Sequence, residues 1–327
     1  MLPGLVISLI CLAAIFYLVD PHKLLAALQQ ANFRLVLLSY LISLLWLLIR
    51  GIIWRTLLQE KATLRQTFLT FNEGNLLNNL LPFRLGEVGR AFLLARKANL
   101  GFWQVFSTVL IERALDVALA AGLLLSTLPF VVGADWAQTA AVAAGGIVLT
   151  GLGVLYFLAH RSDWAMQQFE RLAGRFSFTS RLQQSIGTQL RLFLSGLEVL
   201  TDLRRFLAAV SWSVLNWCIA IGQYYILMRA FFPESQFLWA AFSLGVIALG
   251  ISVPSSPGNL GPYELALVTA LSLFGLDQSA SAAMAFTAHF GNYLVTGLIG
   301  AYALAQDGET LANIYRQIQH IPDQTAQ

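Results

Sequence analysis

Arg84, Glu87 and Arg90 recur at intervals of three residues in a part of the chain that is otherwise largely apolar. Side chains at this spacing lie along one side of a helix. That helix would begin after Pro82, and the free N–H groups and positive dipole end of a helix N-terminus attract phosphate. The three charges therefore suit the binding of an anionic head group. The alternative is a buried hydrogen-bonded network that only holds the segment together.

A stripe of asparagines precedes these charges. Asn72, Asn75 and Asn79 have side-chain amides that can hydrogen-bond a head group or neighbouring side chains. After the asparagines the sequence turns through Pro82 and Gly86, which lie on either side of Arg84. We therefore expect a helical hairpin whose two arms both carry polar groups.

A third polar group opens the next apolar segment. Glu112 and Asp116 are one helical turn apart, and Arg113 can reach Asp116 three positions on. Such a cluster at membrane depth could gate a cavity or exchange protons, because ionisable groups there are costly unless they pair or face water. An architectural clamp between helices is the alternative.

A second Pro/Gly-rich break lies near the end of the chain. The residues expected to shape its turn are Pro254, Pro257 and Gly261, and Gly258 and Asn259 are candidate substrate-binding residues. Glu264 follows the break, and His289 occupies a place in the last apolar segment that matches the cluster of Glu112, Arg113 and Asp116. Histidine changes its charge near neutral pH, so His289 is a candidate site residue. A buried, neutral packing histidine is the alternative.

The composition indicates that these groups belong to a membrane protein. Of 327 residues, 57% are hydrophobic and 11% charged, whereas a soluble domain carries about 25% charged residues. Cys11 and Cys218 both fall in apolar runs, where a bridge or a metal site is not expected. The net charge of +3 is spread over short loops, which suits membrane orientation and not nucleic-acid binding.

We predict an all-α integral membrane protein with six full spans and two Pro/Gly-broken re-entrant hairpins. The expected spans are 3–19, 35–57, 107–132, 137–159, 206–229 and 280–304, and the expected hairpins are 66–100 and 237–275. Apolar runs of about 17 to 25 residues are long enough to cross a bilayer. The arm from Pro262 to Gly275 is too short to do so and is expected to turn within it.

Lysine and arginine in the short loops predict the orientation. Lys61, Arg65, Arg96 and Lys97 mark one cytoplasmic side, and the 160–204 connection marks it again. We therefore expect the protein in the plasma (inner) membrane, with both chain termini in the cytoplasm. Lys23 and Arg34 would then lie outside, against the general trend.

We expect a single membrane domain over residues 1–327. It divides into a first half (1–159), a cytoplasmic linker (160–204), a second half (205–305) and a short cytoplasmic tail (306–327). The linker repeats apolar residues at helical spacing, namely Leu182, Ile186, Leu190, Phe193, Leu197 and Leu200. It is expected to be an interfacial helix that joins the halves, and a sensor of anionic lipid is the alternative.

The two halves read as an inverted repeat. In each, a hairpin lies between two spans, and both turns contain Pro-x-x-Leu-Gly followed by a glutamate, Glu87 or Glu264. Trp46 precedes Gly51 by five positions, as Trp217 precedes Gly222. Inverted, Gly/Pro-broken segments are typical of transporters whose site lies between the repeats. Chance similarity of two hairpins is the alternative.

These motifs resemble a known family. The runs GNLLNNLLPFRLGEVGR from Gly74, ERALD from Glu112 and PSSPGNLGPYE from Pro254 are similar to the lysylphosphatidylglycerol synthase transmembrane-region family, also called flippase-like or UPF0104-type. The resemblance covers nearly the whole chain in order. It implies the movement of polar-headed lipids between leaflets, and a site made from Asn75, Asn79, Arg84, Glu87, Arg90, Glu112, Arg113, Asp116 and Glu264.

The chain departs from the full synthase in two respects. His289 stands where the resemblance leads us to expect arginine or histidine, which leaves its charge open. The sequence also ends shortly after its last span, so we expect no aminoacyl-transferase domain and no enzyme of that kind.

Our leading hypothesis is therefore a lipid translocase or lipid-binding protein for anionic phospholipid or polyprenyl-phosphate head groups. An ion-coupled transporter of small solutes is one alternative. A membrane-embedded lipid-linked glycosyltransferase is another, although the sequence contains no Asp-x-Asp. No Walker A motif is present, and we expect no cofactor or metal. The expected partners are anionic membrane lipids, with a homo-oligomer or a separate lipid-synthesising enzyme as further candidates.

Overall fold

The structure is a computed structural model, which describes residues 2–81, 85–131, 135–175, 180–251 and 257–309, together with 311, 313, 314 and 316. This part of the chain is helical and contains no β-strand. The α-helices are α1 (Leu2–Leu18), α2 (Pro21–Gln30), α3 (Phe33–Leu57), α4 (Leu64–Leu80), α5 (Leu85–Ala98), α6 (Phe102–Val131), α7 (Asp135–His160), α8 (Ser162–Arg175), α9 (Ser180–Leu197), α10 (Leu203–Phe231), α11 (Phe237–Gly250), α12 (Pro262–Ser272) and α13 (Gln278–Gln306). Short 3-10 turns are η2 (Glu198–Leu200) and η3 (Pro257–Asn259).

The helices α3, α6 and α10 are long and apolar enough to cross a membrane. A fourth span results if the bent pair Val6–Leu18 and Pro21–Gln30, which meet at 84°, counts as one. The remaining expected crossings coincide with α7 and α13, which do not meet the same criteria among the described residues. The protein is therefore a multi-pass helical membrane protein.

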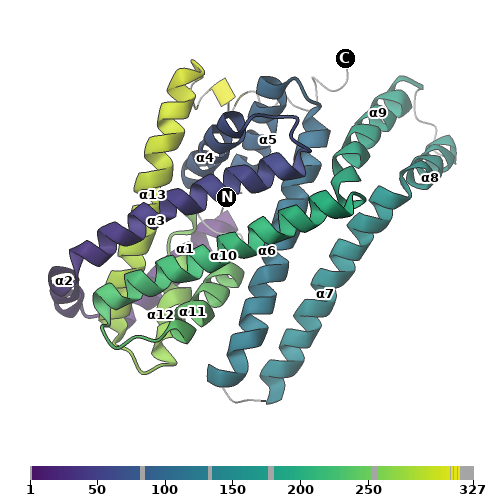
Figure 1. Cartoon of the computed structure of the whole chain (residues 1–327). Coiled ribbons are helices and arrows are strands. Elements are labelled where there is room, and N and C mark those ends of the chain that lie inside the picture. The colour runs from purple at the N-terminus through teal and green to yellow at the C-terminus, as the bar shows by residue number, and fades with distance from the viewer. Residues whose placement is uncertain are drawn as a thin grey trace.

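The long helices cross the molecule in pairs. Figure 1 shows α3 and α10 side by side, and α6 beside α7, with α4 and α5 near one end of the molecule. The helix α13 packs against α4, and α12 packs against α11, α13 and α1. The two expected hairpins thus correspond to α4 with α5 and to α11 with α12.

Local sequence explains where the hairpin arms begin. Thr63 and Gln66 form a reciprocal capping box at the start of α4. Pro262 occupies the first turn of α12, where its missing N–H costs nothing, and Glu264 accepts a hydrogen bond from the Gly261 N–H at 2.7 Å. Both arms therefore start at residues whose side chains satisfy free backbone donors.

Close packing of α4 and α5 depends on two glycines. A Cβ atom on Gly86 would lie 2.1 Å from the carbonyl oxygen of Gly74, and one on Gly74 would lie 2.8 Å from Arg90 Cβ. Either added methyl would force the helices apart. This approach brings the polar groups of both arms within reach of each other.

The linker forms the helices α8 and α9. Leu194 and Leu197 are buried, and Leu190 and Phe193 pack against the same hydrophobic cluster, which includes Ile111 and Leu115 of α6. Ile186 is exposed. The C-terminal half of α9 is therefore part of the helical core and not only a surface helix.

Candidate functional site

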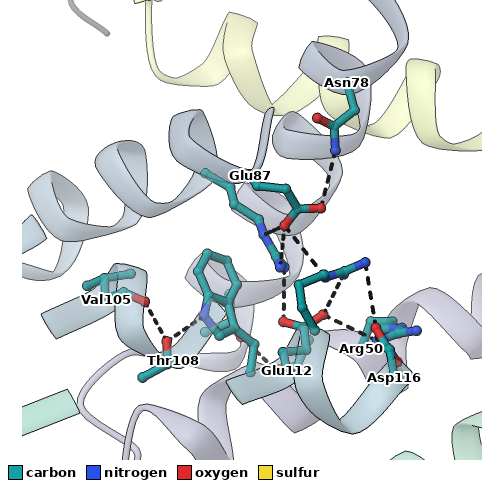
Figure 2. Close-up of polar contacts among 12 residues, drawn as sticks. Arg50, Asn78, Glu87, Val105, Thr108, Glu112 and Asp116 are labelled. Carbon is teal, nitrogen blue, oxygen red and sulfur yellow. Dashed lines mark hydrogen bonds and ion pairs between the residues drawn. The ribbon is translucent and has the colours of Figure 1, made fainter. Parts of the chain in front are cut away.

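Six charged side chains from three helices meet in one place, which we call the charge cluster. Its members are Arg50 of α3, Glu87 and Arg90 of α5, and Glu112, Arg113 and Asp116 of α6. Figure 2 shows Arg50, Glu87, Glu112 and Asp116 converging from these elements. The structure thus brings together five residues proposed from the sequence and adds Arg50.

Glu112 lies at the centre of the charge cluster and is 1% exposed. Its carboxylate accepts hydrogen bonds from three guanidinium groups, at 3.2 Å from Arg50, 3.0 Å from Arg90 and 3.0 Å from Arg113. A carboxylate buried this deeply needs such partners, because an unpaired charge is costly to desolvate.

The other two acids bind the outer sides of the same arginines. Asp116 lies 2.9 Å from Arg50 and accepts a longer hydrogen bond, 3.4 Å, from the Trp217 indole of α10. Glu87 lies 2.8 Å from Arg90 and 3.7 Å from Arg113, and accepts from the Asn78 amide at 3.4 Å. The charge cluster therefore joins α3, α4, α5, α6 and α10.

Aromatic rings cover two of the guanidinium groups. Arg50 lies over Trp46 at 4.9 Å, and Arg90 lies over Trp54 at 4.8 Å and over Phe71 at 5.1 Å. The Trp54 indole donates to Thr108, which in turn donates to the Val105 carbonyl (Figure 2). Cation–π contacts of this kind hold a desolvated arginine in one orientation.

Arg113 differs from the other members of the charge cluster. Three arginines and three acids balance, so these six residues have no net formal charge. The Arg113 side chain is 37% exposed, whereas Arg90 is 2% exposed. Arg113 is therefore the member best placed to bind an external anion while the buried arginines hold the acids.

A second group of contacts forms around His289 of α13. Its Nδ1 lies 2.5 Å from Glu264 Oε1, and its Nε2 lies 2.9 Å from the carbonyl oxygen of Gly258. Tyr293 also donates to that carbonyl, at 2.6 Å. Gly258 and Gly261 have φ of 70° and 95°, which favour glycine. The turn residues Gly258 and Gly261 are thus tied to Glu264 and His289.

Two asparagines of the stripe make side-chain hydrogen bonds, one to α13 and one within α4. Asn79 donates to Thr296 at 3.4 Å, and the buried Asn72 donates to the Phe68 carbonyl within α4. Asn75 is half-buried and makes no side-chain hydrogen bond to the described residues. The asparagine that contacts the charge cluster is Asn78, which sequence analysis did not select.

Some of the other residues proposed from the sequence lie in the described part of the chain, and some lie outside it. Pro257 and Asn259 lie in η3, where both are half-buried and Asn259 has a φ of 59°. Gly86 lies in the first turn of α5, at the close approach to α4. Pro82, Arg84 and Pro254 lie outside the described residues, so the roles proposed for them stay predictions.

A third group of charges, which the sequence motifs did not predict, lies at the base of α5. Lys97 of α5 contacts Asp307 and the buried Glu73 of α4, at 2.7 Å from Glu73. Burial alone would raise the pKa of the Asp307 carboxyl, but hydrogen bonding and the charge of Lys97 hold this pKa below its usual range. The contacts join the hairpin to the end of α13.

A signal for Arg50 was present in the sequence. It is an arginine inside an apolar span, and the rule that selected Glu112 applies equally to it. Glu73 satisfies the same rule. By contrast, no group of three or more His, Cys, Asp or Glu side chains able to hold a metal occurs within the described ranges.

Comparisons with known proteins support the resemblance seen in the motifs. A family model described as the lysylphosphatidylglycerol synthase TM region matches residues 1–300. A UPF0104 membrane protein of Methanothermobacter thermautotrophicus is 23% identical over 94% of this chain and 96% of its own length. A UPF0104 membrane protein of Methanocaldococcus jannaschii is 20% identical, with 92% and 93% covered.

A third relative carries an enzyme name. Glycosyltransferase AglD of Haloferax volcanii is 25% identical over 98% of this chain but only 56% of its own length. The present chain therefore spans little more than half of that protein. No solved structure matches the chain.

Proposed function

The chain belongs to the lysylphosphatidylglycerol synthase transmembrane-region family, and from that membership we propose that it translocates or binds membrane lipids with anionic head groups. The lipids in question are anionic phospholipids or polyprenyl phosphates. The observation that carries the proposal is the partly exposed Arg113 at the rim of a buried, charge-balanced cluster.

The head group would bind by exchanging partners with Arg113. The guanidinium group contacts Glu112 at 3.0 Å but reaches Glu87 and Asp116 only at 3.7 and 3.6 Å. A phosphate can replace these longer contacts with charge-assisted hydrogen bonds. Arg50 and Arg90 would meanwhile keep Glu112 neutralised. Because the cluster has no net formal charge when no ligand is bound, we expect the head group to bind reversibly, as the release of lipid requires.

We further propose six crossings and two hairpins that turn within the bilayer. The supporting observation is helix length: α5 and α11 each have 14 residues and α12 has 11. At about 1.5 Å per residue these arms reach roughly 17 to 21 Å, short of the ~30 Å hydrocarbon core. Both termini would then lie in the cytoplasm, and the protein would reside in the plasma (inner) membrane.

In this proposal the protein is not itself an enzyme and takes no cofactor. It acts alone or as a homo-oligomer on lipid that a separate enzyme synthesises. The rival favoured by a specific observation is a lipid-linked glycosyltransferase, because one relative bears that name. That relative has a large additional part that this chain does not match, so the name is weaker support than the site.

The experiment is leaflet exchange in vesicles that contain the purified full chain. Wild-type protein is expected to speed exchange of fluorescent phosphatidylglycerol, and Arg113→Gln to slow it about tenfold or more. The estimate follows because a hydrogen bond to a charged group contributes about 1.5–3 kcal/mol, and 1.4 kcal/mol is a factor of ten.

The matched control is Arg191→Gln, since Arg191 is an arginine with a 70% exposed side chain on α9. It is expected to exchange lipid like the wild type. Equal exchange rates in Arg113→Gln and the wild type would remove Arg113 from the site. Sugar transfer to a lipid-linked acceptor by the purified chain would instead favour the glycosyltransferase.

A further inference from the structure

The His289 imidazole lies between two oxygen atoms that face it as acceptors. A backbone carbonyl can only accept, so the 2.9 Å contact to Gly258 requires a proton on Nε2. The 2.5 Å contact between Nδ1 and Glu264 Oε1 requires a second proton, on either the ring or the carboxyl group. Together the pair holds one proton more than a neutral histidine beside an ionised glutamate.

The protein surrounds this pair closely. Glu264 is fully buried, and its other oxygen accepts from the Gly261 N–H. The rings of Tyr263 and Tyr293 both lie 4.4 Å from the imidazole centroid. This enclosure leaves the extra proton shared within the pair and not with bulk water.

Among the residues that the structure describes, the titratable groups that face the pair are phenols and one thiol. Tyr263 belongs to α12 and Tyr293 to α13. Tyr224 of α10 hydrogen-bonds Tyr263. Tyr40 of α3 lies near Tyr263, and Cys11 of α1 lies near Glu264 and Gly261. The helix α11 carries no ionisable residue. From α4 the polar contact is Asn79 with Thr296, and from α2 the contact is Asp20 with Ser279 at the start of α13. The extra proton of the pair therefore resides on Glu264 or His289.

Loss of this proton would break one of the two contacts. If the ring keeps one proton, one of its nitrogens has a lone pair in place of an N–H group. That nitrogen, either Nδ1 beside the carboxylate or Nε2 beside the carbonyl, then repels the oxygen that it contacts. Both partners anchor the turn, because Glu264 holds the Gly261 N–H and His289 holds the Gly258 carbonyl. The turn η3 packs against α4, and Asn78 of α4 donates to Glu87. The proton is thus linked to the charge cluster through two packed elements.

We propose that the Glu264–His289 pair is the binding site of a coupling proton whose uptake and release drive movement of η3. The inference rests on the proposed lipid translocation, to which it adds a driving ion. Protonation closes both contacts and holds the turn against α4. Release of the proton breaks the contact of His289 with either Glu264 or Gly258 and so loosens η3, while Tyr293 continues to donate to the Gly258 carbonyl. The packing of η3 against α4 then changes, and with it the position of Asn78 beside Glu87. Proton-exchanging carboxylate and histidine groups are the usual elements of such coupling in membrane proteins.

A spectroscopic measurement tests the proton site without any transport. Nitrogen-15 NMR of the full chain in bilayers, with His289 assigned by a His289→Gln sample, reports whether each ring nitrogen carries a proton. Infrared spectra compared with Glu264→Gln report a protonated carboxyl group. We expect either two protonated ring nitrogens or a protonated Glu264. One bare ring nitrogen beside an ionised Glu264 at neutral pH would overturn the proposal.

Transport then tests the coupling. Vesicles with an internal pH dye should show proton movement that accompanies exchange of fluorescent phosphatidylglycerol by the wild type. Glu264→Gln should lose this proton movement, while it keeps the fold because glutamine can still cap the Gly261 N–H. His160→Gln, which changes an exposed histidine of α7, should behave like the wild type.

The outcomes separate the two proposals. Lipid exchange by the wild type without proton movement, or equal proton movement in the wild type and Glu264→Gln, overturns the coupling and leaves lipid translocation standing. No lipid exchange by the wild type overturns the proposed function, and the NMR and infrared result then still decides whether the pair binds a proton.

Discussion

Arg90 and Arg113 both bind Glu112, yet their surroundings predict different roles. Arg90 lies between two acids and between the rings of Trp54 and Phe71. Arg113 is exposed on one side. At the scale of single residues we therefore assign stability to Arg90 and ligand exchange to Arg113.

Replacement of Arg90 tests this division. Arg90→Met would remove a guanidinium group that contacts both Glu87 and Glu112, and a buried pair that loses one partner costs about 3–5 kcal/mol. We expect a large fall in thermal stability and in purified yield. Arg96→Met, in the same helix but with a 52% exposed side chain, is expected to cost less than about 1 kcal/mol.

The double variant Arg90→Met/Glu87→Gln should recover part of the lost stability, since it removes the acid that loses its 2.8 Å ion pair with Arg90. Thermal unfolding of all three purified variants in one detergent provides the comparison. Equal stability of Arg90→Met and Arg96→Met would show that the charge cluster does not hold the helices together.

At the scale of helices, glycine spacing decides how closely the hairpin arms pack. A Cβ on Gly86 would meet both the Gly74 carbonyl and the Asn78 side chain, whereas a Cβ on Gly222 of α10 meets nothing within 4 Å. Both glycines lie in helices, so the same substitution can be compared directly.

Gly86→Ala is expected to destabilise the protein and to weaken the Asn78 contact with Glu87 by separating α4 from α5. Gly222→Ala should be neutral or stabilise by up to about 1 kcal/mol, as alanine favours helix. Melting temperatures and yields of the two variants measure the difference. A Gly86→Ala protein as stable as Gly222→Ala would mean that α4 and α5 are not in close contact.

The same glycines show where the two halves of the predicted inverted repeat differ. The pairs Trp46 with Gly51 and Trp217 with Gly222 have equal spacing, but Gly51 closely approaches Phe68 whereas Gly222 has open space. The glutamates agree better, because Glu87 and Glu264 are each the third residue of a hairpin helix. Glu87 reaches arginines of α5 and α6, and Glu264 reaches a histidine of α13.

At the scale of the whole molecule, the proposed hairpins determine which residues are shielded by the membrane. Leu260 lies in the second turn and is 43% exposed in the isolated chain. Glu234 is also exposed and lies in the connection between α10 and α11. In the proposed topology Leu260 is within the bilayer, and Glu234 faces the outer solution.

Cysteine labelling in intact cells tests this topology, in a chain with Cys11 and Cys218 changed to alanine. Glu234→Cys should react with both small and bulky impermeant thiol reagents. Leu260→Cys should react only with small reagents that enter a cavity, because irregular backbone at membrane depth must line protein or water. Equal reaction of both sites with the bulky reagent would exclude a re-entrant second hairpin.

The sequence alone determined the properties that depend on neighbouring residues. Apolar runs located the helices α3, α6 and α10, which are long and apolar enough to cross a membrane, and the Pro/Gly breaks separated α4 from α5 and α11 from α12 close to the observed bounds. The family was also predicted from three motifs and is confirmed by the match over residues 1–300. Hydropathy and turn chemistry are local, which is why they can be read without a fold.

Only the tertiary structure decided which charges meet. Arg50 is separated from Glu112 by 62 positions and His289 from Glu264 by 25. Glu112 could have paired within its own helix, but packing of α3 and α5 against α6 supplied two further arginines. Pairing over such separations depends on how close helices approach. That distance is set by glycines such as Gly86 and by the aromatic rings that orient each guanidinium group, and not by spacing along the chain.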